Sequence, residues 1–111
     1  MKNVNYYQQV YEVTRLIPEG YVSTYGAIAD HLALGSARMV GWALNQLKGL
    51  RGDVPAHRVV NRKGELSGRH FFGHPDMMAE LLISEGVDVV DNRIISFDKH
   101  FWHPSEHLDI T

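Results

Sequence analysis

Two short helical patterns separated by a tight break are the feature that most constrains how this chain can fold. Apolar residues at 28, 29 and 32 give an inward face to a helix at about residues 25–33, and those at 39, 40, 43, 44 and 47 do so for a helix at about 37–48. Gly35 and Ser36 separate the two, and Ser36 is suited to cap the second helix. This pair has the outline of a helix-turn-helix, although similar corners occur in other small helical proteins.

The other segments predict short elements around this pair. The spacing of apolar residues from Val4 to Ile17 predicts an amphipathic helix over about 4–17, which Pro18-Glu19-Gly20 ends. Ser23 or Thr24 could cap the helix that follows them. Before the middle of the chain we expect an extended piece at 22–24, and after it an apolar strand at 55–60, a turn at 61–64 with Gly64 at positive φ, and a loop at 65–74. A helix from Pro75 to Ser84, stopped by Gly86, and a hairpin at 87–97 should follow. The tail from Asp98 is polar, with Phe101 and Trp102 as candidate anchors.

Charge is unevenly divided along a chain whose 111 residues suit one domain. Residues 1–69 carry nine Lys/Arg and five Asp/Glu, whereas residues 70–111 carry two Lys/Arg and eight Asp/Glu. A positive half therefore precedes a negative half, although the net charge of the chain is −2. Such asymmetry hints at a polyanionic partner, weakly when taken alone. No secretory signal or membrane-spanning stretch is expected, which makes a cytosolic location the default.

The residues offer little for enzyme chemistry. Cysteine is absent, which excludes disulfides, thiolate nucleophiles and Cys-ligated metals. No serine lies in a GxSxG elbow, no GxxxxGK[ST] or GxGxxG loop is present, and Ala56 beside His57 offers that base nothing to activate. The pair His70 and His74 and the triplet at 100, 103 and 107 have spacings that could bind a metal, but no carboxylate pattern accompanies them. We therefore expect neither a metal nor a nucleotide cofactor.

Four segments carry recognisable motifs over most of residues 4–90: Ile17–Ala29 (IPEGYVSTYGAIA), Ala37–Ala43 (ARMVGWA), Pro55–Val60 (PAHRVV) and Leu81–Val87 (LLISEGV). In order and spacing they resemble the O6-alkylguanine-DNA alkyltransferases, which have PCHRV where this chain has PAHRV. The acceptor Cys is replaced by Ala56, and no room is expected for the family's N-terminal domain. Both departures fit the alkyltransferase-like proteins, which bind alkylated guanine, leave the alkyl group in place and pass the lesion to nucleotide excision repair.

This resemblance implies a role for each matching residue. Tyr25 would crowd the 3′ phosphate of the target nucleotide and help to rotate it out of the duplex, and Arg38 would enter through the minor groove and fill the gap. Ala56 cannot accept an alkyl group, and its small side chain leaves space for the O6 substituent. Thr24, Ser36 and Ala37 would contact DNA beside these residues.

The pocket and a relay complete the implied site. Arg69 would stack on the alkylated base from the far side of the pocket, and Val60 and Ser67 would line the same space. His57, Glu85 and Asn61 resemble the family's proton-relay and hinge residues. Because the relay has nothing to activate here, we expect scaffolding roles and no catalytic residue.

The sequence thus predicts a single small α/β domain, mainly α, with a winged helix-turn-helix-like DNA-binding core and short strands. Residues 1–97 would form the domain, and 98–111 a C-terminal tail without an assigned role. The expected partners are double-stranded DNA containing O6-alkylguanine and nucleotide excision repair proteins. We further expect a monomer with no membrane association and a cytoplasmic location, nucleoid-associated in a bacterium. Two alternatives stay open: a helix-turn-helix transcription regulator indifferent to alkylation, and an enzyme with another nucleophile, such as a hydrolase built around His57.

Overall fold

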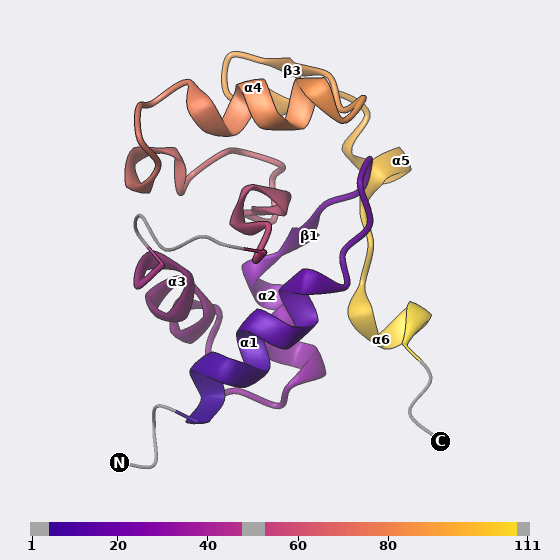
Figure 1. Ribbon diagram of the computed structural model, residues 1–111. Helices are drawn as coiled ribbons and strands as arrows, with labels where there is room; N and C mark the ends of the chain where they lie inside the picture. The colour runs from indigo at the N-terminus through magenta and orange to yellow at the C-terminus, as the bar shows by residue number, and fades with distance from the viewer. Residues whose placement is uncertain (1–4, 48–52, 109–111) are drawn as a thin grey trace.

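Three helices occupy the lower half of the structure in Figure 1: α1 (Asn5–Arg15), α2 (Tyr25–His31) and α3 (Ala37–Asn45). The computed structural model describes residues 5–47 and 53–108. All three predicted helices are present but shorter than expected. Left-handed backbone at Ala33, with φ 57°, follows the end of α2. The expected first residue of α1, Val4, and last residue of α3, Lys48, lie outside the described ranges.

Hydroxyl caps start both helices of the helix-turn-helix pair. The Thr24 hydroxyl accepts a hydrogen bond from the Ala27 amide at 2.9 Å, and the Ser36 hydroxyl accepts one from the Arg38 amide at 3.2 Å. Each bond satisfies an amide that a helix start leaves without a partner. The sequence therefore located both helix starts correctly.

A two-stranded parallel pair separates the two hydrophobic cores. Strands β1 (Ser23–Thr24) and β2 (Val59–Val60) pair with Ser23 opposite Val59 and Thr24 opposite Val60. Successive side chains of a strand point to opposite faces. Val59 accordingly packs into the core built by the first three helices, and Val60 into a second core with Leu66, Met78 and Leu82.

The strand predicted over 55–60 is mostly wrong. Residues Ala56–Arg58 form a 3₁₀ turn, η2, in which the Arg58 amide donates to the Pro55 carbonyl at 2.9 Å; only Val59 and Val60 are extended. In a strand, His57 and Arg58 would point to opposite faces. The turn lets both side chains reach the one carboxylate of Glu85.

The upper half of the structure covers the second core. It contains η3 (Arg69–Phe71), α4 (Met77–Ser84) and a hairpin of β3 (Val89–Val90) and β4 (Arg93–Ile94). Asp91 and Asn92 have φ values of 53° and 60° at the hairpin turn, as a type I′ turn requires. The predicted helix stop, Gly86, and the turn residue Gly64 also have positive φ. The segment 65–74, predicted as loop, includes the short helix η3.

Residues 98–108 pack against the rest of the chain through the two expected anchors. They form the end of α5 (Phe97–His100) and α6 (Pro104–His107). Phe101 makes a bridge with Val22, and the Trp102 amide donates to the Val22 carbonyl at 2.8 Å. The Trp102 side chain is buried in the helical core, and the His107 ring stacks on it. Of the helices described, none has the length and apolar character needed to span a membrane.

Candidate nucleic-acid interface

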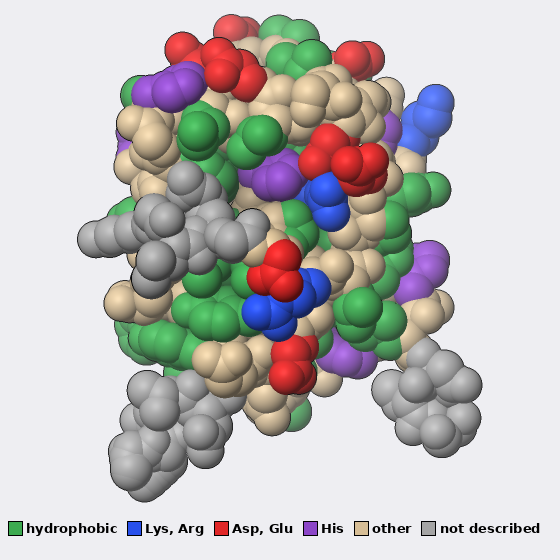
Figure 2. Space-filling model, viewed as in Figure 1, with side chains coloured by type: hydrophobic (Ala, Val, Ile, Leu, Met, Phe, Trp, Pro, Cys, Tyr) green, Lys and Arg blue, Asp and Glu red, His purple; other side chains and the backbone are tan. Residues whose placement is uncertain are grey.

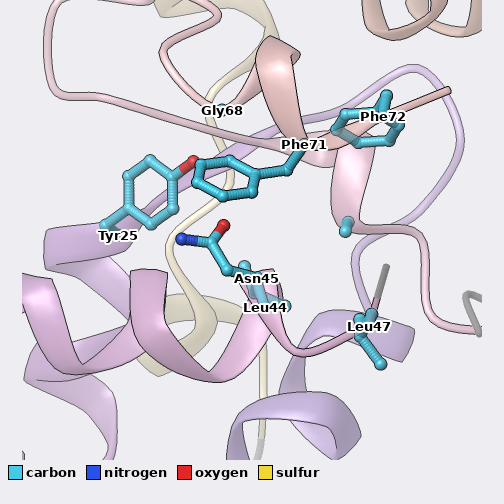
Figure 3. A pocket seen from close by; sticks show the side chains of 8 residues that line it. Tyr25, Leu44, Asn45, Leu47, Gly68, Phe71 and Phe72 are labelled. Carbon is cyan, nitrogen blue, oxygen red and sulfur yellow. The ribbon is translucent and has the colours of Figure 1, made fainter. Parts of the chain in front are cut away.

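Two adjacent cavities lie between α3 and the Ser67–Phe72 segment. The outer cavity has a volume of about 430 Å³, and its lining comprises Tyr25, Ala37, Arg38, Gly41, Trp42, Asn45, Ser67, Gly68 and Phe71. The inner cavity has a volume of about 20 Å³, room for about one water-sized group, and its lining comprises Tyr25, Leu44, Asn45, Leu47, Ala56, Gly68, Phe71 and Phe72. Figure 3 shows Tyr25 and Phe71 reaching toward each other, with the Asn45 amide directed at the space between them. The structure thus joins residues from α2, α3, η2 and η3 in one place.

The absence of a side chain at Gly68 leaves room for the Tyr25 hydroxyl. A Cβ added to Gly68 would lie 2.7 Å from that hydroxyl, so the Tyr25 side chain would have to shift. Burial raises the pKa of Tyr25, and a hydrogen bond with Ser67 opposes that shift without cancelling it. The hydroxyl therefore stays protonated near neutral pH and can donate a hydrogen bond.

Helix α3 turns one face to the outer cavity and the other to the core. Val40, Ala43 and Leu44 are buried, whereas Arg38 and Trp42 are exposed one turn apart. Small residues at 37 and 41 leave the helix backbone accessible on the same side as Arg38. The helix start thereby offers a cation and a wide aromatic ring beside an open cavity.

Unpaired cations surround Tyr25. A third cavity, of about 480 Å³, is lined by Tyr25, Gly26, Ala37, Asn61, Arg62, Lys63 and Glu65. Arg38, Arg62 and Lys63 are exposed and form no ion pair with another described residue. Ion pairs do hold Arg15 to Asp53, Arg58 to Glu85 and Arg93 to Glu65. Three of the described cations without an ion pair thus border the cavities, whereas Lys99, which also has none, lies in α5.

Behind Ala56 lies a hydrogen-bonded group centred on Glu85. His57 Nε2 and Glu85 Oε2 are 2.8 Å apart. Arg58 donates to both carboxylate oxygens of Glu85, at 2.9 and 2.8 Å, and to the Ile17 carbonyl at 2.8 Å. This group ties η2 to the end of α4 and to the segment after α1.

The protonation of this group follows from its burial. Burial lowers the pKa of His57 below its usual value, because desolvation of the ring outweighs the attraction of Glu85. Burial also raises the pKa of Glu85, but hydrogen bonds from Arg58 and His57 outweigh it, so that this pKa is lowered overall. Near neutral pH the pair is thus a neutral imidazole donating to a carboxylate, although its 2.8 Å separation would also suit an ion pair.

Four of the residues predicted for the site are placed elsewhere or used otherwise. Val60 is fully buried in the second core, and Thr24 is buried with its hydroxyl occupied as a helix cap. Asn61 bonds to the Lys63 and Glu65 amides and to the Glu65 carboxylate, which shapes the 61–65 turn and keeps Asn61 out of the His57–Glu85 group. Arg69 lines none of these three cavities, and its guanidinium donates to the Leu66 carbonyl at 3.0 Å.

Other predicted residues do meet, and they are joined by residues that sequence reasoning missed. Tyr25, Ala37, Arg38 and Ser67 line the outer cavity, Ala56 lines the inner one, and Ser36 caps the helix between them. The missed residues are Trp42, Asn45, Phe71 and Phe72. Trp42 had a signal in the sequence, because it is a large aromatic residue outside the apolar stripe of its helix.

The histidines of the C-terminal segment have partners of other kinds. His100 bonds to the Gly20 carbonyl, His103 contacts Asp30, and His107 stacks on Trp102. No three His, Asp or Glu side chains within residues 5–47 and 53–108 are grouped so that they could hold a metal ion.

Comparison with known proteins identifies the same fold. The chain is 33% identical over 109 residues to alkyltransferase-like protein 1 of Schizosaccharomyces pombe, covering 94% of this chain and 100% of that protein. It is 36% identical over 107 residues to the DNA base-flipping protein of Escherichia coli, covering 92% and 78%. The crystal structure of S. pombe Atl1 with damaged DNA containing O6-carboxymethylguanine superposes with a TM-score of 0.80 at 31% identity, over 92% of this chain and 98% of that one. These matches confirm the predicted small, mainly helical, helix-turn-helix-like fold.

The family is defined by a match that spans the whole candidate site. The family model described as "6-O-methylguanine DNA methyltransferase, DNA binding domain" matches residues 5–87, from the start of α1 to Val87, shortly after the end of α4. Tyr25, Arg38, Ala56 and the loop that closes the cavities all lie within it. The chain therefore belongs to the family of the DNA-binding domain of 6-O-methylguanine DNA methyltransferases.

Proposed function

We propose that this protein recognises O6-alkylated guanine in double-stranded DNA by turning the nucleotide out of the duplex, and that it leaves the alkyl group on the base. Ala56 is the observation that carries the proposal. It stands between Pro55 and His57 in the wall of the inner cavity, and the resemblance to the alkyltransferases implies that this is the position of their acceptor cysteine. The similarity to proteins named as DNA base-flipping proteins and to Atl1 bound to damaged DNA supports the proposal.

The cavities suit an extruded base. Proteins that act on a single base turn it into a pocket and hold it by stacking and by hydrogen bonds to its edge. The outer cavity, at about 430 Å³, offers aromatic rings together with the Tyr25 hydroxyl, the Asn45 amide and the Ser67 hydroxyl. Arg38 lies on the rim, where a planar and permanently charged guanidinium could occupy the space that the base leaves.

Alkyl transfer to the protein requires a nucleophile that this site lacks. A soft thiolate beside a base is the usual acceptor, and the chain contains no cysteine. The Ala56 methyl group cannot form a bond to the alkyl carbon. His57 and Glu85 then hold η2 against α4, and we assign them no catalytic role.

We also propose that the bound lesion is passed to nucleotide excision repair proteins. The support for this step is the resemblance to alkyltransferase-like proteins, since a protein that holds a lesion without repairing it needs a second activity to remove it. We assign no surface to that contact.

The test uses two duplexes that differ by one methyl group. Affinity is measured by fluorescence anisotropy for a duplex containing O6-methylguanine and for the same duplex with guanine, and the bases are then analysed by mass spectrometry after incubation with excess protein. We expect tighter binding to the methylated duplex and full recovery of the methylated base. Arg38→Ala should weaken lesion binding, whereas Lys99→Ala, an exposed cation in the acidic C-terminal part, should not.

Each alternative has its own outcome. Loss of the methyl group from DNA would show an enzyme with another nucleophile. Equal affinity for the two duplexes, with preference for a particular base sequence, would show a transcription regulator. Either result would overturn the proposal.

A further inference from the structure

We propose that Trp42 and Phe71 form an aromatic pair that stacks on the extruded base in the outer cavity. The inference rests on the proposed function and assigns two residues that motif matching did not single out. Both side chains line the outer cavity, Trp42 from α3 and Phe71 from η3. An aromatic side chain thus borders the cavity from each of the elements that enclose it.

Their exposure shows that the fold does not use them as core. Trp42 is 52% exposed and Phe71 is 50% exposed, although both are large apolar residues. Their neighbours along the chain fill the interior instead: Ala43 is buried in the helical core, and Phe72 packs against the second core. Two half-exposed aromatic rings around one cavity are typical of a binding surface.

The chemistry of the cavity favours a planar heterocycle as the occupant. Every base has a π-face, and stacking on aromatic side chains is tolerant of base identity. The same cavity is lined by polar groups that could bond to the edge of a base, namely the Tyr25 hydroxyl and the Asn45 amide. Stacking would supply affinity for any extruded base, while the edge contacts and the inner cavity would sense its O6 substituent.

This arrangement also gives η3 a purpose. The Arg69 guanidinium closes onto the Leu66 carbonyl, and the Phe71 amide donates to the Gly68 carbonyl at 3.1 Å, so the short turn is held by its own bonds. A turn fixed in this way presents Phe71 beside Tyr25 at a defined position (Figure 3). The loss of conformational entropy when a base stacks on Phe71 is then smaller than it would be for a ring on an unrestrained loop.

The experiment compares alanine and aromatic replacements at both positions. The affinity of Trp42→Ala and Phe71→Ala for the O6-methylguanine duplex should fall by about 5- to 150-fold each, the range found when a base-stacking residue is truncated. Trp42→Phe and Phe71→Tyr should retain most of the affinity, because a ring remains. Ile83→Ala is the matched control, since Ile83 is also 52% exposed but lies on α4 and lines none of the three cavities. Circular dichroism checks that each variant is folded.

Tryptophan fluorescence provides a second readout. The chain contains two tryptophans, and Trp102 is buried against His107. Lesion DNA should therefore quench Trp42 fluorescence in the parent, and the quenching should vanish in Trp42→Phe, which still binds. If the parent protein prefers the methylated duplex and both alanine variants bind it as tightly as the parent, the proposed aromatic pair is wrong and the proposed function stands. If the parent protein shows no preference for the methylated duplex, both the aromatic pair and the proposed function are wrong.

Discussion

At the residue scale, two adjacent hydroxyls in β1 have opposite energetic roles. The Ser23 hydroxyl is buried without a hydrogen-bond partner among the described residues, whereas the Thr24 hydroxyl caps α2. An unsatisfied buried hydroxyl costs about 1–3 kcal/mol, and a lost cap about 1 kcal/mol. Ser23→Ala should therefore raise the free energy of unfolding by about 1 kcal/mol, and Thr24→Ala should lower it by about as much. Urea denaturation of the two variants measures both values, and a lower value for Ser23→Ala would contradict the prediction.

Gly68 sets the position of Tyr25, which makes it sensitive to the smallest substitution. Its φ of −90° is open to any residue, so a change to alanine acts through the 2.7 Å contact with the Tyr25 hydroxyl alone. We expect Gly68→Ala to displace the ring, to cost about 1–3 kcal/mol of stability as overpacking does, and to weaken lesion binding. Gly73→Ala is the control, because its Cβ would meet Met77 at an ordinary 3.6 Å. Equal binding by the two variants would show that Tyr25 needs no fixed position.

At the scale of elements, the His57–Glu85 pair links η2 to α4 and makes this link sensitive to pH. Burial lowers the pKa of His57, so below its usual pKa of about 6.5 the unfolded chain binds a proton more readily than the folded one. Glu85, with a pKa below its usual range, contributes stability that is lost only at lower pH. Stability should thus fall as the pH is lowered from 7.5 to 5.5, chiefly through His57.

Two histidine variants separate the contribution of His57 to the pH dependence of stability from that of another histidine. His57→Gln keeps a neutral donor near Glu85 and cannot titrate, so its stability should depend less on pH than that of the parent. His70→Gln makes the same replacement at an exposed histidine and is the matched control. Thermal unfolding followed by circular dichroism at several pH values gives the comparison. A parental pH dependence in His57→Gln would mean that another group controls it.

Elements governed by local rules could be predicted from the sequence, and those governed by a distant partner could not. Apolar spacing and capping hydroxyls identified the helices of the helix-turn-helix pair, and the residues at 91 and 92 identified the hairpin. The 3₁₀ turn at Ala56–Arg58 depends on Glu85, which lies 27 to 29 residues further along the chain. The docking of residues 98–108 depends on Val22 in the same way, although its anchors were visible as aromatic residues.

The candidate site shows the same division. Residues inside the four motifs, such as Tyr25, Arg38 and Ala56, were predicted for the site and line the cavities. Trp42 occupies a variable position of the Ala37–Ala43 motif and Phe71 lies outside all four motifs, and the two line one cavity because α3 and η3 fold against it. Val60 was misplaced because the strand that carries it turns alternate residues toward different cores, and the sequence did not show which residue faces which core.

At the scale of the whole molecule, charge is unevenly distributed over the surface. Acidic side chains gather over α4 and the β3–β4 hairpin in Figure 2, where exposed residues include Glu80, Asp88 and Asp91. The exposed cations Arg38, Arg62 and Lys63 instead border the cavities around Tyr25. A duplex carries a dense line of negative charge, so it should approach the face with the cavities and leave the α4 face in solvent.

Salt dependence tests this orientation. Each phosphate neutralised on binding contributes about −0.9 to the slope of log K against log salt concentration. Arg62→Ala and Lys63→Ala should each make the slope shallower by about one and should weaken binding to methylated and unmodified duplexes alike, because a phosphate contact carries no information about the base. Glu80→Gln and Asp88→Asn are the matched controls and should change neither slope nor affinity, since neither residue lines any of the three cavities and exposed charges further apart than a screening length of about 8 Å interact weakly. A shallower slope in Glu80→Gln or Asp88→Asn, or an unchanged slope in Arg62→Ala and Lys63→Ala, would show that the duplex binds a different face. The cavities would then not contact DNA.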